Sequence, residues 1–218
     1  MTPFLQQPLT VADLLERLGD IAASRIRLHP APGTASEADL IRVHDHDGRI
    51  CELVDCVLVE KAMGFFESRL AAVLIHLFET FLERKPLGIV VGADGMMRLA
   101  PGLVRVPDVS FVSWSRLPGR RVPRTPIPDL APDLAVEVLS AGNTQAEMKR
   151  KVGEYFAADV RLVWLVHTRS RSVQVFKSPG RSAQRGEGET LSGGSVLPGF
   201  SLTVGEWFER AEKEPPRA

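Results

Sequence analysis

The chain has 218 residues, 27 Lys and Arg against 27 Asp and Glu, and 44% hydrophobic residues. This composition is typical of a soluble globular protein with one sizeable domain, and it excludes a disordered chain or a binder that relies on overall positive charge. No stretch reaches transmembrane length, and the N-terminus lacks the basic and apolar segments of a signal peptide. We therefore expect a cytoplasmic protein without membrane contacts. Cys51 and Cys56 match no zinc or redox spacing, which predicts free thiols.

Charge is distributed unevenly along the chain. Residues 1–100 carry 10 Lys and Arg against 14 Asp and Glu, whereas residues 101–182 carry 13 against 7. A local phosphate-attracting surface requires such a surplus, but an arginine-rich solvated surface explains it equally well.

The N-terminal third predicts one helix and two strands. Thr10 is a suitable N-cap, with Asp13 at the capping-box position, for a short helix ending at Gly19. Residues 39–44 and 50–60 resemble strands, and the second run is expected to break near its centre.

A polar turn, His44 to Gly48, separates these two runs. Its Asp47-Gly48 pair is a strong hairpin signal. His44 and His46 alternate as metal ligands on a strand would, but polar turn chemistry explains them more simply than a metal site.

The longest amphipathic segment, residues 63–85, predicts a helix that ends at Pro86. Glu67 lies in its first turn, where the helix dipole favours an acid, and a supporting role at a metal site is a second interpretation. Residues 88–92 and 96–99 flank an Asp-Gly pair, which predicts another hairpin.

Two apolar runs in the centre of the chain each contain one acidic residue. Residues 104–112 contain Asp108, and residues 132–140 contain Glu137. Runs of this kind are typical of core strands. A carboxylate buried there costs several kcal/mol unless it is paired or binds a cation. We therefore expect a metal ion or a strong basic partner at this pair.

Basic residues surround the two acidic runs. The Pro-rich segment 115–128 predicts an exposed loop whose arginines would hold a nucleic-acid backbone: Arg116, Arg120, Arg121 and Arg124. The helix predicted over 144–157 adds Lys149, as a further nucleic-acid contact, and Lys151. Glu147 lies one turn before Lys151, and a capping box with Thr144 explains it at least as well as a functional role.

The remaining elements complete a single domain over residues 1–218. Residues 161–167 and 172–176 predict a hairpin, 178–195 a loop, and 204–213 a terminal helix. The order of helices and strands favours an α/β fold in which helices flank a mixed β-sheet. The predicted core spans about 50–180, with an N-terminal extension over 1–49 and a C-terminal turn and helix over 195–214.

The central motifs resemble the Uma-type family of restriction endonucleases, within the PD-(D/E)XK nuclease-like superfamily. The resemblance rests on Arg-Val-Pro-Asp108-Val-Ser, on Pro-Asp-Leu-Ala-Val-Glu137-Val-Leu-Ser, and on the run from Asn143 to Tyr155. It covers roughly residues 50–210 and implies a restriction-endonuclease-like core with N-terminal helix and hairpin elaborations.

The resemblance also implies a site for Mg²⁺ or Mn²⁺. Asp108 and Glu137 would be metal ligands, and the main-chain carbonyl of Val138 would be a third. The superfamily places a lysine two residues after the glutamate, where this chain has Leu139. In the family a helix lysine stands in, which here is Lys151.

Three functions remain open. The first is a Mg²⁺-dependent DNA endonuclease, acting as a homodimer if it cuts both strands of a palindrome. The second is an inactive nuclease-fold module that binds nucleic acid or protein, and the third is a hydrolase of another phosphoester. Acids that are open to solvent beside Lys151 would favour an enzyme, and covered acids would favour the binding module.

Overall fold

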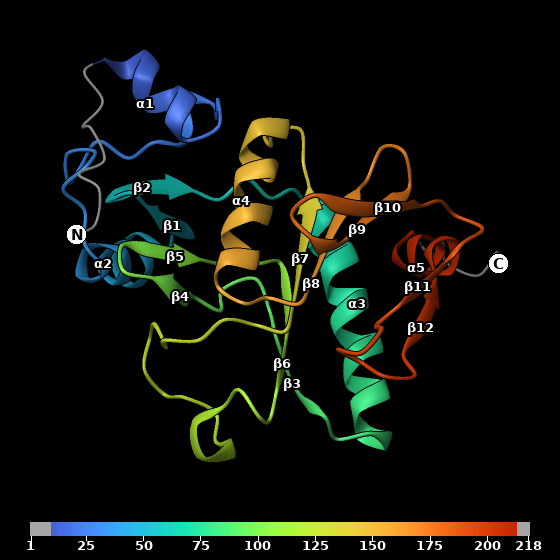
Figure 1. Ribbon diagram of the computed structural model, residues 1–218. Coiled ribbons are helices and arrows are strands. Elements are labelled where there is room, and N and C mark those ends of the chain that lie inside the picture. The colour runs from blue at the N-terminus through green and yellow to red at the C-terminus, as the bar shows by residue number, and fades with distance from the viewer. Residues whose placement is uncertain (1–9, 213–218) are drawn as a thin grey trace, which may run out of the picture.

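The computed structural model describes residues 10–212 (Figure 1). Its helices are α1 (Val11–Arg17), α2 (Glu37–Asp47), α3 (Phe65–Arg84), α4 (Gln145–Ala157) and α5 (Val204–Ala211), with short 3-10 turns η1 (Ala23–Arg25) and η2 (Pro118–Arg120). Its strands are β1 (Cys51–Val54), β2 (Val57–Glu60), β3 (Gly88–Val91), β4 (Met97–Ala100), β5 (Leu103–Arg105), β6 (Val109–Ser113), β7 (Leu134–Leu139), β8 (Leu162–His167), β9 (Ser172–Ser178), β10 (Arg181–Arg185), β11 (Thr190–Ser192) and β12 (Ser201–Thr203).

The central sheet has six strands in the order β10-β9-β8-β7-β6-β3. Strands β7 and β8 are parallel and α4 connects them, while the other neighbours are antiparallel. Parallel neighbours require such a crossover, because the chain must return to the same end of the sheet. The predicted mixed β-sheet flanked by helices is confirmed.

Alternate residues of β7 face opposite layers. Leu134, Val136 and Val138 pack with α3 and α5 in the largest hydrophobic cluster, which includes Trp164 and Trp207. The other face packs against α4 through a smaller cluster that includes Ala135, Met148, Val152 and Tyr155. Because Glu137 alternates with Val136 and Val138, its side chain lies on the α4 face.

A second sheet, β2-β1-β5-β4, lies beside α4 (Figure 1). Helix α2 packs with β1 and β5 in one apolar cluster, and α1 packs with β1 and β2 in another. Helix α4 thus stands between the small sheet and the β8–β9 hairpin. This position brings residues of both sheets to a single helix.

The N-terminal strand prediction was wrong. Residues 39–44 belong to α2, which begins at a Ser36–Asp39 capping box. Gly48 ends this helix with a φ of 60°, so the Asp47-Gly48 pair is a helix terminus and no hairpin. Residues 50–60 do break at the centre, into β1 and β2. The predicted helix at Thr10 is confirmed, with both hydrogen bonds of its capping box.

Three further predictions needed correction. Residues 88–92 and 96–99 form no hairpin, since β3 pairs with β6 and β4 pairs with β5. The run 104–112 is interrupted at Pro107, and its two halves enter different sheets. The predicted loop 178–195 contains β10, whose residues are mostly exposed and polar, and β11, which has only three residues, so neither gave a strand pattern.

Other predictions are confirmed. The helices predicted over 63–85, 144–157 and 204–213 are α3, α4 and α5, with residue 213 outside the described residues, and the hairpin predicted from residues 161–167 and 172–176 is β8–β9. Neither cysteine forms a disulfide. Among residues 10–212, no helix combines the length and apolar character that crossing a bilayer requires.

Candidate active site

Asp108 lies where the chain enters β6, and its side chain is bonded to β7. The Asp108 N–H donates to the Val136 carbonyl over 3.0 Å, and the Val138 N–H donates to Asp108 Oδ2 over 2.6 Å. The carboxylate therefore extends the β6–β7 ladder beyond the last backbone pair. Only 3% of Asp108 is exposed.

Glu137 is held by two side chains from one face of α4. Lys151 Nζ donates to Glu137 Oε1 over 3.2 Å, and the Tyr155 hydroxyl donates to the same oxygen over 2.5 Å. These two residues are four positions apart in the helix, so they project from the same face. Glu137 is 4% exposed. Tyr155 is therefore a direct hydrogen-bond partner of the acid.

The structure adds Glu52, a third buried acid that the sequence analysis did not select. Glu52 Oε1 accepts hydrogen bonds from Lys151 Nζ at 3.0 Å and from the Val106 N–H at 3.2 Å. Its other oxygen accepts from Arg105 at 2.7 Å. Glu52 is an isolated acid within an apolar strand, the same pattern that identified Glu137, and this signal was available in the sequence.

Lys61 is the second residue that sequence reasoning missed. Its Nζ lies 2.6 Å from Asp108 Oδ1 and donates a hydrogen bond to the Val106 carbonyl. The Asp108 Oδ1 atom has no hydrogen bond of acceptable geometry, so the contact with Lys61 is an ion pair alone. Lys61 directly follows β2, and no local pattern distinguishes it from a surface lysine.

The buried groups form a charge-balanced cluster, which we call the acid–lysine cluster. It contains three carboxylates and three cations: Glu52, Asp108, Glu137, Lys61, Arg105 and Lys151. All are nearly or fully buried. Buried charges require such pairing, because each isolated charge would cost several kcal/mol.

The environment changes the protonation of these groups. Burial raises the pKa of Glu137 above its usual value, although Lys151 and Lys61 oppose the change. Burial alone would also raise the pKa of Glu52, but the charges of Lys151 and Arg105 lower it below the usual range. Burial would lower the pKa of Lys151, but Glu137 and Glu52 raise it. At neutral pH, Lys151 therefore stays protonated and Glu52 stays ionised.

The oxygen donors near Asp108 are of the type that binds Mg²⁺. Mg²⁺ takes one or two carboxylates and keeps several waters, and Asp108 and Glu137 supply the two carboxylates. The Val138 carbonyl projects from the same edge of β7 as its N–H, which bonds Asp108. Within residues 10–212, however, no three His, Cys, Asp or Glu side chains converge as a preformed metal site. The acids are instead compensated by lysines.

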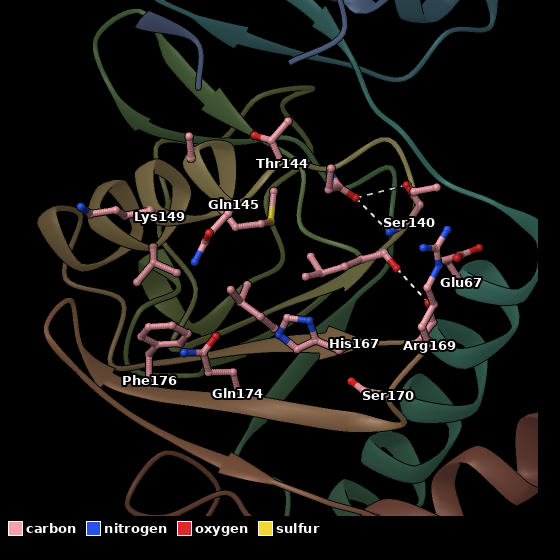
Figure 2. A pocket seen from close by; sticks show the side chains of 18 of the residues that line it. Glu67, Ser140, Thr144, Gln145, Lys149, His167, Arg169, Ser170, Gln174 and Phe176 are labelled. Carbon is pink, nitrogen blue, oxygen red and sulfur yellow. Dashed lines mark hydrogen bonds between the residues drawn. The ribbon is translucent and has the colours of Figure 1, made fainter. Parts of the chain in front are cut away.

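A groove of about 1230 Å³ lies on the side of α4 that faces the β8–β9 hairpin (Figure 2). Its walls include Leu139 and Ser140 after β7, Lys149 of α4, and residues of the β8–β9 hairpin. Leu139 stands where the resemblance described above implies a lysine. The strand end next to Glu137 therefore contributes an apolar wall to this groove.

Comparison with known proteins identifies the family. The model of the Uma2 family, described as "Putative restriction endonuclease", matches residues 37–205. The chain belongs to the Uma2 family. No curated protein matches the chain significantly.

A solved structure supports the fold of this Uma2 member. The chain resembles the crystal structure of a putative nuclease belonging to DUF820 from Anabaena variabilis ATCC 29413, with a TM-score of 0.67 and 16% sequence identity. The match covers 75% of this chain and 92% of the other. At this identity the likeness establishes the fold alone.

The other predicted site residues lie outside the acid–lysine cluster. Glu147 is buried and forms a two-pronged ion pair with Arg25, at 2.7 and 2.9 Å. Its N–H is capped by Thr144, but its side chain bonds Arg25 and Asn143, so the capping box is only half formed. The pKa of Glu147 is lowered because Arg25 and Lys151 outweigh its burial. Glu67 lies on the wall of the groove.

The predicted nucleic-acid contacts divide into two groups. Arg116 is committed to the protein, since it bonds the buried Asp133 at 2.7 Å and Asp159 at 3.0 Å. Arg120, Arg121 and Arg124 are exposed, as the loop prediction required. Lys149 is exposed on the groove side of α4.

Proposed function

We propose that this Uma2-family chain is a divalent-metal-dependent DNA endonuclease whose reaction centre is the acid–lysine cluster. The observation that carries this proposal is convergence. Three acids and two lysines come from β1, the end of β2, the start of β6, β7 and α4, and they meet in the interior. Apolar side chains of similar volume could stabilise the fold as well as these charged groups do. A function therefore explains the cluster better than stability does.

Each residue has a chemical role in this proposal. Asp108, Glu137 and the Val138 carbonyl would hold the metal ion, which would polarise a phosphoryl oxygen and stabilise its charge. Glu137 holds a proton more readily than an exposed glutamate, because burial raises its pKa. Lys151 remains protonated and donates from 3.0–3.2 Å to two carboxylates, so it can also donate to a phosphate oxygen.

The charge balance has a consequence for the order of binding. The six charged groups of the cluster sum to zero, so a divalent ion alone would add two uncompensated positive charges to the interior. A nucleic-acid phosphate supplies negative charge that offsets them. We therefore expect metal and DNA to bind cooperatively.

A second function, an inactive module that binds nucleic acid or protein, is the one that covered acids favour. Asp108 and Glu137 are 3% and 4% exposed, and lysines already neutralise them. Under this alternative the cluster is purely structural. The two proposals differ in whether any metal-dependent cleavage exists.

A plasmid nicking assay with Mg²⁺, with Mn²⁺ and with a chelator tests the proposal. Cleavage that requires metal and is lost in Glu137→Gln and Asp108→Asn would support an endonuclease. Glu79→Gln is the matched control, since Glu79 is exposed on α3. Cleavage that persists in Glu137→Gln would rule out this centre, and absent cleavage with retained DNA binding would favour the module.

Cleavage of both strands at a palindrome would require two centres, and we include a homodimer in the proposal for that case. Sedimentation of the protein with and without a duplex tests this assembly. A monomer on the duplex that still makes double-strand breaks would contradict it.

A further inference from the structure

The groove beside α4 contains the features of a nucleic-acid strand site. Residues two apart on a strand lie about 7 Å from each other and point to the same face. Leu139 of the groove wall and Glu137 of the acid–lysine cluster have this relation on β7. The groove therefore begins two residues along β7 from Glu137, although no residue of the acid–lysine cluster lines it.

The groove offers both ring faces and positive charge. His167 and Phe176 project into it from β8 and β9, beside the amide of Gln174 (Figure 2). Lys149 and Arg169 lie on opposite sides of the groove in this view. Both cations are exposed, and neither forms an ion pair within the described residues, unlike Arg116, Arg150 and Arg161.

We propose that this groove binds a single-stranded segment of nucleic acid, with phosphates near Lys149 and Arg169 and a base stacked against Phe176 or His167. The inference rests on the proposed function and deepens it, because it names the form of substrate that approaches the cluster. Positive residues that track a backbone, together with rings on which bases stack, are the general means of holding single strands.

Size and shape favour an unpaired strand over a duplex. Pockets for one small molecule measure roughly 300–1000 Å³, and this groove exceeds that range at about 1230 Å³. The rings lie between α4 and the β8–β9 hairpin, where only an unpaired base could reach them. Base pairs in a duplex expose edges rather than faces in their grooves.

One acidic residue, Glu67, also lines the groove. It lies beside Arg169 in Figure 2. A carboxylate repels phosphate, so we place the phosphates of the strand mainly near Lys149, and Glu67 partly offsets the attraction of Arg169. Glu67 is then available to accept a hydrogen bond from a base amino group.

Fluorescence anisotropy with labelled oligonucleotides of about 12 nucleotides tests the inference. The measurement uses the full chain in chelator, with single-stranded DNA, single-stranded RNA and duplex DNA as separate probes. We expect a single strand to bind more tightly than the duplex, and the two single strands establish which sugar is preferred. The double variant Lys149→Ala/Arg169→Ala should weaken binding at least about tenfold and reduce the salt slope by about 1.4.

A matched double variant, Lys177→Ala/Arg181→Ala, removes the same charge from exposed positions outside the groove. It should leave the affinity nearly unchanged, whereas Phe176→Leu should weaken single-strand binding about tenfold by removing the stacking face. Equal losses in both double variants, tighter duplex binding, or no effect of Phe176→Leu would each overturn the inference.

The outcome is separable from that of the proposed function. Single-strand binding through the groove without any metal-dependent cleavage would retain this inference and remove the endonuclease. If the protein cleaves DNA in a metal-dependent way but the groove variants bind single strands normally, the endonuclease is retained and this inference is removed.

Discussion

Lys151 is the residue on which the acid–lysine cluster most depends. Its side chain is 2% exposed and contacts two carboxylates, Glu137 at 3.2 Å and Glu52 at 3.0 Å. In Lys151→Met, Glu52 keeps its hydrogen bonds from Arg105 and Val106, but Glu137 keeps only the Tyr155 hydroxyl among its described side-chain partners. The substitution therefore leaves Glu137 without an ion-pair partner, and only the more distant charge of Lys61 still opposes its burial.

Leaving one buried charge unpaired costs about 3–5 kcal/mol, which corresponds to a decrease in Tm of roughly 6–20 °C for a chain of this size. The pH dependence follows from Glu137. Its pKa is already above the unfolded value, and losing Lys151 raises it further. Protonation then relieves the penalty at low pH, and stability is lost as the pH rises toward the folded pKa. We expect a larger deficit at pH 8 than at pH 5.5.

Urea unfolding followed by circular dichroism at both pH values measures this effect. The double variant Lys151→Met/Glu137→Gln should recover much of the loss, because no unpaired charge remains. Lys149→Met, on the exposed side of the same helix, should change stability by no more than about 0.5 kcal/mol. A loss below about 1 kcal/mol in Lys151→Met, or one equal at both pH values, would refute the charge argument.

Three further predictions concern metal, acid and the N-terminal segment. Calorimetric titration should show tighter Mg²⁺ binding in the presence of a non-cleavable oligonucleotide than in its absence. In Glu137→Gln the oligonucleotide should no longer increase the Mg²⁺ affinity. Equal affinities with and without the oligonucleotide in the unmodified protein would contradict the coupling of charges. The pKa of Asp133 is lowered, because hydrogen bonds from Ser113 and the charge of Arg116 outweigh its burial, so its contribution is present above about pH 4 and lost as the pH falls. Asp133→Asn should therefore lower the Tm at pH 7 and flatten its decrease between pH 5 and pH 2, and an unchanged pH profile would exclude this role. Gly19 has a φ of +86°, and an added Cβ would lie 2.5 Å from the Glu147 nitrogen; Gly19→Ala should destabilise the protein by about 1–3 kcal/mol in urea, and an unchanged midpoint would contradict the close approach.

Local chemistry was enough to predict several elements. The apolar period of residues 63–85 and the Thr144 cap specified α3 and α4, because these signals act within a few residues of each other. The strand prediction for residues 39–44 was wrong because it considered only the run itself. Short apolar runs are ambiguous, and the Ser36–Asp39 capping box that decides for a helix lies at the edge of that run.

Pairing between distant segments could not be predicted in the same way. Residues 88–99 carry a strong turn signal, yet β3 and β4 join different sheets, since each finds a better partner further along the chain. Pro107 divides one apolar run between those two sheets. A turn signal reports the local bend of the backbone and not the neighbours of the strands that follow it.

Local sequence was sufficient to predict that Asp108 and Glu137 are buried acids that need a cation, because a carboxylate within an apolar strand is costly unless a positive charge compensates it. The folded chain was needed to show that the partners are Lys61 and Lys151, that Glu52 completes the cluster, and that Leu139 opens onto a separate groove. The two kinds of information act over different distances along the chain. Burial is encoded by neighbouring residues in the chain, whereas the ion pairs of the acid–lysine cluster join groups as many as 99 positions apart, whose distance is fixed only when both sheets pack against α4.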